Sequence, residues 1–363
     1  MLFALLKEDY MRAAVFQDVG KISVEEVPKP ECPKDGLLVK VRACGICGTD
    51  ARTFFNGDDR ARPPWILGHE LGVVVEEVGE LPRDEVDVEK GDRIHVVSTL
   101  SCGVCEYCRM GMENLCIDRG LLGYYPHPGG YAEYMPIARV ALGNVMKVPD
   151  DVPLEHATLT DPFSDALNGV ERLGVELGDT AVVIGAGPVG TMQAQVIRAM
   201  GAGKVILSEI NKQRLKLSEN VLGRDRIVYV GPDDGDLVDV VMDETDGKGA
   251  QRIIVACSSN KAQEDALRMA KKRARIVYFG GLPKTKPTIN FASNYLHYGE
   301  QEVTGAYASN YKQQHLALAM IRSGTLSAEK YITHVLPLEE IAKGFEYIRS
   351  GEALKVIIRP EMD

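Results

Sequence analysis

The stretch TAVVIGAGPVG, residues 180–190, constrains the fold of this chain more than any other part of its sequence. Its apolar run Val182–Ile184 is typical of a central strand in a parallel sheet, and three glycines follow at once. The G-x-G-x-x-G pattern is weak evidence alone, but a preceding strand and a following helix are the context in which it binds a dinucleotide. The first glycine allows the tight turn, the second admits a pyrophosphate close to backbone amides, and the third lets helix and strand pack closely. We therefore predict dinucleotide contacts along this turn, by Gly185, Gly187, Pro188, Val189 and Gly190.

An acidic residue ends the next predicted strand. Glu209 lies nineteen residues after Gly190. A carboxylate at this place accepts hydrogen bonds from ribose hydroxyls and would repel a 2′-phosphate. The sequence therefore favours NAD over NADP; a glycine-rich turn with an unrelated surface glutamate is the alternative.

The pattern of apolar segments along the sequence changes twice. Further apolar segments at 226–230, 252–257 and 275–281 alternate with helical stretches, which predicts a doubly wound parallel sheet. Before it, short apolar runs broken by Gly and Pro predict a β-rich domain. We expect the last part of the chain to return to that first domain. The predicted division is 1–157, 158–299 and 300–363, with the first ten residues as a short extension.

Composition and charge exclude some partners. The chain has a formal net charge of −10 and no basic cluster, which argues against nucleic acid or an anionic membrane as partner. No apolar run approaches the roughly 20 residues needed to cross a bilayer, and the start lacks the features of a signal peptide. We therefore predict a cytoplasmic protein, in which clustered cysteines bind metal more often than they form disulfides.

Four of the eight cysteines lie within fifteen residues, with the spacing C-x2-C-x2-C-x7-C. Four thiolates on one loop suit tetrahedral Zn²⁺, and such all-cysteine sites are closed and structural. An iron–sulfur cluster is the main alternative, but in the bacterial pattern the fourth cysteine comes sooner and proline follows it. Here Ile117 follows the fourth cysteine. We therefore predict a structural zinc on Cys102, Cys105, Cys108 and Cys116, with unliganded cysteines as the remaining alternative.

A second, mixed set of candidate ligands lies upstream. The segment CGICGTD supplies Cys44 and Cys47, and LGHELG supplies His69 and Glu70. A thiolate, an imidazole and a carboxylate from separate segments are typical of zinc sites that keep a position open for water or substrate. Each residue taken singly also has an alternative explanation without metal: a cysteine as a packed side chain, and His69 as a hydrogen-bonded histidine.

Together these segments resemble the zinc-dependent medium-chain dehydrogenases, and within them the sorbitol (polyol) and threonine dehydrogenase branch. The resemblance runs over nearly the whole chain. It rests on GICGTD, GHE, GDR, the four-cysteine stretch, GGYAEY, DPFSDALNGV and GAGPVG, in that order. It implies a GroES-like catalytic domain interrupted by a Rossmann coenzyme domain, and a homodimer or homotetramer.

The resemblance also implies roles for individual residues. It makes Cys47, and not Cys44, the cysteine ligand of a catalytic zinc, with His69 as the second ligand. Glu70 is either a ligand or close behind the metal, and Asp161 ligates directly or through water. The remaining implied roles are a substrate-proton relay for Thr49, orientation of the histidine for Asp50, and ribose binding for Glu209 with Arg214.

The reaction implied is NAD-dependent oxidation of a small secondary alcohol to a ketone, with one catalytic and one structural zinc per chain. A polar set of residues around the metal favours a polyol or sugar-derived alcohol, and L-threonine is an alternative. Classical members have a relay histidine where this chain has Arg52. Its guanidinium either pairs with a substrate carboxylate, which would make the substrate a sugar acid, or pairs with a protein carboxylate. A noncatalytic zinc- and NAD-binding protein is the remote alternative.

Overall fold

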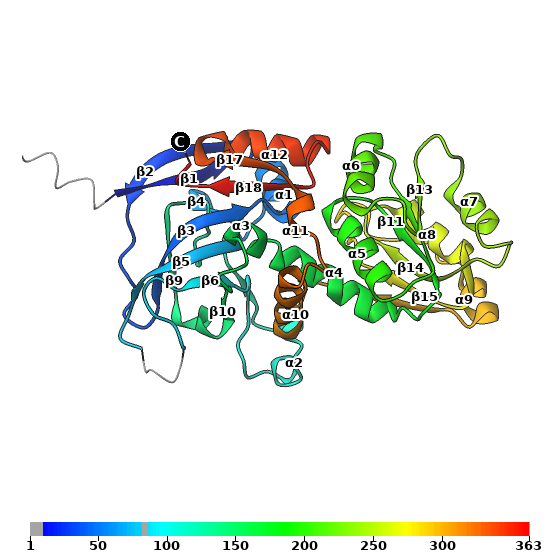
Figure 1. The fold of residues 1–363 in the computed structure, drawn as a ribbon, viewed down its shortest axis with the longest axis horizontal. Coiled ribbons are helices and arrows are strands. Elements are labelled where there is room, and N and C mark those ends of the chain that lie inside the picture. The colour runs from blue at the N-terminus through cyan, green and yellow to red at the C-terminus, as the bar shows by residue number, and fades with distance from the viewer. Residues whose placement is uncertain (1–9, 82–85, 363) are drawn as a thin grey trace, which may run out of the picture. The chain divides into compact units, whose positions relative to one another are not determined.

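The structure is a computed structural model that describes residues 10–81 and 86–362 (Figure 1). Its chain divides into two compact units. The β-rich unit contains the described residues up to Asp161, Asn310–Gly324 and the residues from Ile332 onward. The α/β unit contains Pro162–Ser309 and Thr325–Tyr331. The extension predicted at the start of the chain lies outside the described residues, except for Tyr10.

The main sheet of the β-rich unit has seven strands in the order β10-β6-β5-β3-β18-β17, with β9 paired on β3. Its last strand in sequence, β18, runs parallel to β17 and antiparallel to β3, so residues near the end of the chain lie beside the GICGTD segment (Figure 1). The strands are β3 (Leu37–Gly45), β5 (Glu70–Val78), β6 (Arg93–Val96), β9 (Tyr134–Ile137), β10 (Val145–Lys147), β17 (Ile332–Pro337) and β18 (Lys355–Arg359).

Two smaller sheets and several short helices complete this unit. A three-stranded sheet has the order β2-β1-β4, and β7 pairs with β8. These strands are β1 (Tyr10–Asp18), β2 (Lys21–Pro28), β4 (Trp65–Ile66), β7 (Thr99–Leu100) and β8 (Gly120–Leu121). The helices are α1 (Gly48–Asn56), α2 (Glu106–Arg109), η1 (Glu113–Leu115), η2 (Arg139–Asn144), α3 (Leu154–Ala157), α10 (Tyr311–Arg322), η3 (Leu338–Glu340) and α12 (Ile341–Ser350).

One hydrophobic core holds the β-rich unit together. Val41 and Val73 are paired across β3 and β5 and are fully buried. Phe54 of α1 stacks on Phe345 of α12, with ring centroids 4.7 Å apart. The same core thus fixes α1, which follows the GICGTD segment, against the last helix of the chain.

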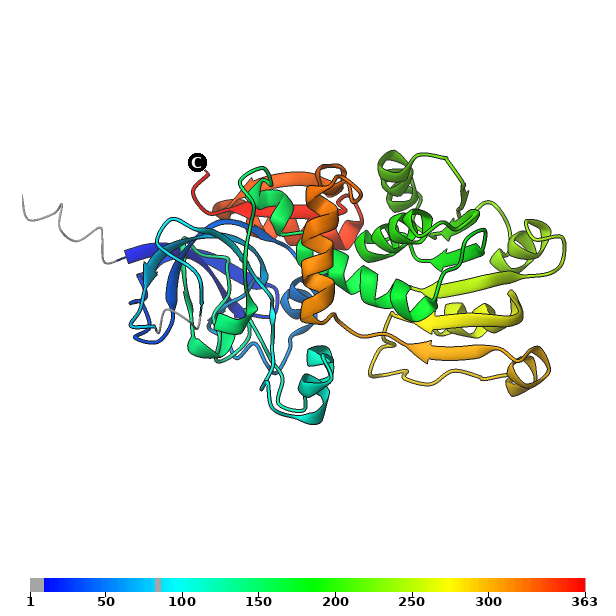
Figure 2. The same cartoon turned by 60° about the horizontal axis from the view of Figure 1, so that its bottom comes forward.

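The α/β unit contains a six-stranded parallel sheet in the order β13-β12-β11-β14-β15-β16 (Figures 1 and 2). Numbered along the unit, this is the order 3-2-1-4-5-6 of a dinucleotide-binding fold, so the predicted doubly wound sheet is confirmed. Its strands are β11 (Thr180–Ile184), β12 (Lys204–Ser208), β13 (Ile227–Val230), β14 (Ala250–Val255), β15 (Ala270–Tyr278) and β16 (Glu302–Gly305). Its helices are α5 (Pro188–Ala199), α6 (Lys212–Leu222), α7 (Leu237–Asp243), α8 (Asn260–Arg268), α9 (Ser293–Gly299) and α11 (Ala328–Tyr331), and α4 (Thr160–Leu173) begins at the division between the units.

Among the helices that the structure describes, none combines the length and apolar character needed to cross a membrane.

Candidate active site and metal centres

The four clustered cysteines converge on one point. Their Sγ atoms all lie within 4.8 Å of one another, and no disulfide joins them. The Sγ atoms of Cys102 and Cys108 are 4.0 Å apart, and those of Cys105 and Cys108 are 3.4 Å apart. Tetrahedral zinc with Zn–S bonds of about 2.3 Å needs sulfurs about 3.8 Å apart. The cluster therefore fits a closed, four-thiolate zinc site.

Local backbone contacts favour thiolates in this cluster. The backbone N–H groups of Cys108 and Ile117 lower the pKa of Cys105 to about 6. The N–H of Cys102 also donates to Sγ of Cys116, at 3.3 Å. Burial and the neighbouring thiols, by contrast, raise the pKa of Cys108 to about 12. Since a metal binds the deprotonated thiol, the backbone contacts suit ligation at Cys105, and the convergence of the four sulfurs carries the assignment of the cluster.

Replacing Cys105 by serine should therefore cost stability and not chemistry. With four thiolates around it, the metal has no open position for a substrate. We expect the melting temperature to fall by roughly 5–10 °C, and kcat below that temperature to change less than about threefold. Thermal unfolding and initial rates on the same preparation measure both effects, and a kcat loss without a loss of stability would contradict this assignment.

Helix α1 positions the cysteine of the mixed set. Cys47 is the N-cap of this helix, and its Sγ accepts the backbone N–H of Thr49 at 3.4 Å. In return, Asp50 accepts the backbone N–H of Cys47 at 3.4 Å. Cys44, by contrast, lies fully buried on β3, where burial raises the pKa of its thiol well above the ordinary value. Of the two cysteines, Cys47 is thus the one presented at a helix N-terminus, which favours a negative ligand.

A buried carboxylate orients the histidine. Asp50 Oδ1 lies 3.2 Å from His69 Nδ1, and both residues are almost wholly buried. The hydroxyl of Tyr131 donates to Asp50 Oδ2 at 2.8 Å. Burial alone would lower the pKa of His69, but the charges of Asp50 and Cys47 hold it well above the ordinary value. The negative surroundings that favour a proton on His69 also favour a metal cation there. Cys47 and His69 therefore fit a metal site in which a carboxylate, Asp50, fixes the histidine ligand.

The carboxylate of Glu70 is held by a lysine from the end of the chain. Lys355 Nζ donates to both Glu70 oxygens at 2.7 Å and to the Ile46 carbonyl at 3.2 Å. Only 3% and 1% of the two side chains are exposed. Burial would lower the pKa of Lys355, but Glu70 outweighs it and holds that pKa above the ordinary value. Of the two arrangements predicted for Glu70, this geometry favours a place behind the metal.

Asp161 is also held by side chains of its own unit. Its Oδ1 accepts hydrogen bonds from Ser98 Oγ at 2.8 Å and from Gln314 Nε2 at 3.1 Å. The Gln314 Oε1 lies 3.3 Å from Nε2 of His95, whose Nδ1 lies 2.7 Å from a backbone carbonyl. All four side chains are buried.

These contacts explain how the four candidate ligands of the catalytic zinc are arranged. In the described part of the chain, only the four-cysteine cluster brings three or more ligand atoms within 4.8 Å of one another. Glu70 faces Lys355 and Asp161 faces Ser98 and Gln314, while Cys47 and His69 remain at the end of α1. The structure therefore gathers these four residues in one unit but does not draw them into a closed cage.

Arg52 lies beside the predicted proton relay. Its Nη2 donates to Thr49 Oγ1 at 3.3 Å. A guanidinium stays protonated and has no acceptor, so Arg52 cannot pass a proton onward as a histidine would. Within the described residues, no ion pair joins Arg52 to a carboxylate.

In the α/β unit, the glycine turn has the predicted form. Gly185 has a φ of +106°, and a Cβ on Gly190 would lie 1.8 Å from the Gly185 carbonyl oxygen, so both positions exclude a side chain. Gly187 is the N-cap of α5, where a Cβ would meet open space, and Pro188 and Val189 open the helix. Free N–H groups at this helix start suit a pyrophosphate.

Glu209 is tied to this turn. Its Oε2 accepts the N–H of Ala186 at 3.0 Å, and its Oε1 accepts the N–H of Asn211 at 2.9 Å. Arg214 lies in the first turn of α6, where its N–H donates to the Asn211 side chain. The structure thus brings the predicted ribose carboxylate next to the predicted pyrophosphate turn.

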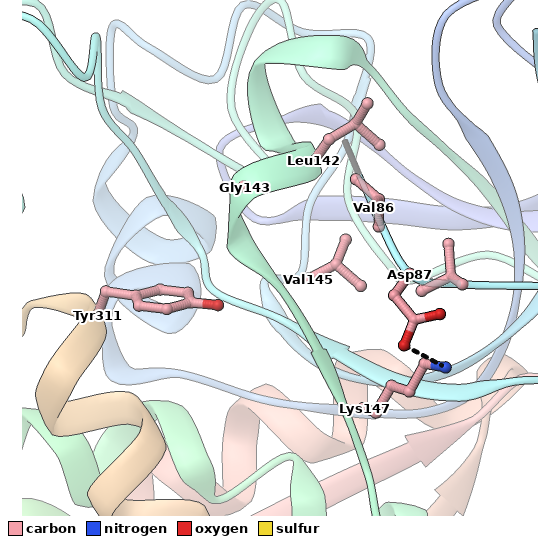
Figure 3. A pocket seen from close by; sticks show the side chains of 8 residues that line it. Val86, Asp87, Leu142, Gly143, Val145, Lys147 and Tyr311 are labelled. Atoms are coloured by element: carbon pink, nitrogen blue, oxygen red, sulfur yellow. Dashed lines mark ion pairs between the residues drawn. The ribbon is translucent and has the colours of Figure 1, made fainter. Parts of the chain in front are cut away.

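A surface pocket of the β-rich unit contains none of these residues (Figure 3). It has a volume of about 290 Å³, and an ion pair of 3.3 Å joins Asp87 to Lys147 on its wall. The other labelled residues include Val86, Leu142, Val145 and Tyr311. The candidate active site is therefore defined by its buried polar contacts and not by this hollow.

Three further residues hold the site and were not predicted from the sequence: Lys355, Gln314 and Ser98. The sequence does contain an indication for Lys355, which starts the apolar run KVIIR. A lysine in such a run is expected to be buried, and a buried lysine needs a partner of opposite charge. No local pattern indicates Gln314 or Ser98, whose roles depend on the tertiary fold.

Comparisons with known proteins agree with this architecture. Residues 33–150 match the model of the alcohol dehydrogenase GroES-like domain, and residues 188–323 match that of the zinc-binding dehydrogenases. An L-threonine 3-dehydrogenase of Bacillus subtilis (strain 168) is 32% identical, over 98% of each chain. A sorbitol dehydrogenase of Bombyx mori is 29% identical, over 97% of this chain and 99% of its own.

Solved structures lead to the same family. A zinc-binding dehydrogenase from Sinorhizobium meliloti 1021, bound to NADP, is 30% identical with a TM-score of 0.86, over 97% of this chain and 99% of its own. The chain belongs to the zinc-dependent medium-chain alcohol dehydrogenase family. The predicted resemblance, the GroES-like domain and the Rossmann-type domain are thereby confirmed.

Proposed function

We propose that this protein is a zinc-dependent oxidoreductase that transfers a hydride between NAD and a secondary alcohol or its ketone. The arrangement at the start of α1 carries the proposal: the Cys47 thiol and the Thr49 hydroxyl lie in one segment, and Asp50 of the same segment contacts His69, which precedes β5. The dinucleotide turn in the other unit and membership of the family support it.

Each residue has a distinct task in this proposal. Cys47 and His69 would hold a catalytic zinc, which would supply Lewis-acid chemistry by lowering the pKa of the substrate hydroxyl. Thr49 Oγ1 would accept the substrate hydroxyl proton while its own hydroxyl proton is released to solvent. Asp50 keeps the His69 ring in the orientation and tautomer that a metal needs. Glu70 would lie behind this set in an ion pair with Lys355, and the pair has no net charge.

Family and site polarity favour a polyol or a sugar-derived alcohol, a class that includes both neutral polyols and sugar acids. Glu70 and Asp161 are buried and bonded to protein side chains. The polar groups left for a substrate are therefore Thr49 and Arg52, which suit a polar alcohol better than a hydrophobic one. Relatives are named sorbitol, L-threonine and erythritol/L-threitol dehydrogenases, so L-threonine remains the second candidate.

The experiment that tests this function follows NADH absorbance over a panel of polyols, sugar acids and L-threonine. We expect NADH formation with at least one member, loss of the rate after zinc is chelated, and recovery when zinc is restored. A rate that survives complete removal of zinc would contradict the proposal.

We propose NAD over NADP because of Glu209, although one solved relative binds NADP. Replacing Glu209 by glutamine keeps an oxygen for one of the two backbone N–H groups but removes the negative charge. We expect kcat/KM for NADP, relative to NAD, to rise at least about tenfold, because like charges placed together cost several kcal/mol. Glu219→Gln, on α6 where Glu219 pairs with Arg224, is the matched control and should leave the ratio unchanged. A wild-type enzyme that uses both cofactors equally would refute the assignment.

Three further points belong to the proposal. The four-cysteine cluster would hold a structural zinc, which gives two zinc ions per chain. Assembly as a homodimer or homotetramer is proposed from the family. A cytoplasmic location is proposed from the cysteine usage of the sequence.

A further inference from the structure

Arg52 presents a positive charge at the predicted substrate hydroxyl. It lies three residues after Thr49 on α1, so the two side chains share one face of the helix. Its guanidinium is exposed and donates to Thr49 Oγ1 at 3.3 Å. The cation is therefore held next to the atom that would receive the substrate proton.

The acidic groups around Arg52 are already engaged. Asp58 has a pKa below its ordinary value, mainly because the Arg60 side chain donates hydrogen bonds to it. The charge of Arg52 adds a smaller lowering of the same pKa. Arg60 Nε and Nη2 occupy the two Asp58 oxygens at 2.9 and 2.7 Å. Asp50 contacts His69 and Tyr131. Within the described residues, Arg52 thus has no carboxylate of its own.

We propose that Arg52 binds a carboxylate of the substrate, so that the substrate is a hydroxy acid and not a neutral polyol. This inference rests on the proposed function. A guanidinium presents a planar fork that matches a carboxylate with two parallel hydrogen bonds. The exposed guanidinium of Arg52 donates to a single neutral hydroxyl, that of Thr49. It can therefore still form two parallel hydrogen bonds with a carboxylate.

The short distance to Thr49 limits where the carboxylate lies. Thr49 Oγ1 is 3.3 Å from Nη2, and a hydroxyl hydrogen bond adds about 2.7 Å. The guanidinium therefore lies within about 6 Å of the reacting oxygen, a reach that suits a carboxylate one or two carbons from the carbinol carbon. The class is that of 2-hydroxy and 3-hydroxy acids, including 2-amino-3-hydroxy acids such as L-threonine.

The reaction balances with the cofactor that the proposed function supplies. The carbinol C–H bond breaks and its hydride forms a C–H bond on NAD⁺. The O–H proton passes to Thr49 Oγ1 as the threonine's own hydroxyl proton is released to solvent, and the C–O single bond becomes a carbonyl. A hydroxy acid and NAD⁺ thus give an oxo acid, NADH and a proton. The carboxylate is unchanged, so Arg52 acts on binding and orientation.

Matched substrate pairs test the inference. Each pair has one carbon skeleton, with a carboxylate in one member and a neutral hydroxymethyl group in the other: L-threonine and threoninol, 3-hydroxybutanoate and butane-1,3-diol, gluconate and sorbitol. For at least one pair we expect kcat/KM to favour the acid by about tenfold to a hundredfold. Arg52→Gln should abolish that preference through KM, lowering kcat/KM for the acid far more than for the matched diol. Arg52→Lys, which keeps charge but not the fork, should retain part of it.

A nearby arginine provides the control. Arg62 is exposed and stacks on the Tyr125 ring at 4.3 Å, so Arg62→Gln removes the same charge and should preserve the acid preference. Calorimetric titration of the protein–NADH complex with each acid, which NADH cannot oxidise, gives a readout independent of turnover, and the wild type should bind the acid more tightly than Arg52→Gln does.

The outcomes separate the inference from the function on which it rests. If acids and diols react equally well, or Arg52→Gln weakens both members of a pair equally, the inference is overturned and the dehydrogenase function stands. If no member is oxidised, the proposed function loses its support, and equal acid binding by wild type and Arg52→Gln would overturn the inference as well.

Discussion

Replacing Cys47 by serine is expected to lower turnover by at least about a thousandfold, because a Lewis acid contributes several kcal/mol to such a reaction and each 1.4 kcal/mol is tenfold in rate. A serine hydroxyl does not ionise at neutral pH and so cannot replace a thiolate ligand. The hydrogen bond from the Thr49 N–H shows that Cys47 Sγ is held at the first turn of α1. The change removes a ligand without disturbing the glycine turn of the other unit, so affinity for NAD should remain within about threefold of wild type. Initial rates and NAD titration measure the two quantities.

Cys44→Ala is the matched control for this experiment. The two cysteines lie in one motif, but Cys44 is packed in the core, where its Sγ faces the carbonyl of Gly45. Its loss should cost some stability and leave turnover within about threefold. If Cys44→Ala abolished turnover and Cys47→Ser did not, the assignment of Cys47 as the zinc ligand would be wrong and Cys44 would take its place.

Replacing Lys355 by methionine is expected to lower the free energy of unfolding by about 3–5 kcal/mol, because it leaves a buried carboxylate without its partner. Both Glu70 oxygens lie 2.7 Å from Lys355 Nζ, and neither side chain reaches solvent. The double variant with Glu70→Gln removes both charges and should recover at least half of that loss. Denaturant unfolding of both variants measures the effect.

An exposed pair is the control for the buried one. Lys343 and Glu340 lie 3.2 Å apart with about half of each side chain exposed, so Lys343→Met should cost less than about 1 kcal/mol. Equal losses for Lys355→Met and Lys343→Met, or a double variant no more stable than Lys355→Met, would contradict a buried ion pair.

The parts of the fold that follow from short patterns were predictable. The glycine turn fixes its own strand and helix, and the alternation after it predicts a doubly wound parallel sheet, which the structure has in the order 3-2-1-4-5-6. The spacing of the four cysteines likewise indicated a single cluster, and their Sγ atoms meet. In each case the residues are close in sequence, so local geometry determines the result.

Other contacts depend on residues far apart in sequence. Glu70 and Lys355 are separated by 285 positions, and Gln314 reaches Asp161 across 153. Such pairs form because β18 and α10 return to the first unit, and no periodicity encodes which polar atoms then meet. Sequence analysis could therefore name Glu70 and Asp161 as candidates but could not decide whether they face the metal or its supporting side chains.

The central claim is that the reacting metal is held by Cys47 and His69, and that the four-cysteine cluster is structural. Zinc content per chain, measured together with turnover on wild type, Cys47→Ser and Cys105→Ser, tests it most directly. The account predicts two zinc ions in wild type, one with no turnover in Cys47→Ser, and one with turnover in Cys105→Ser. Turnover that survived in Cys47→Ser and disappeared with the cluster zinc would contradict it.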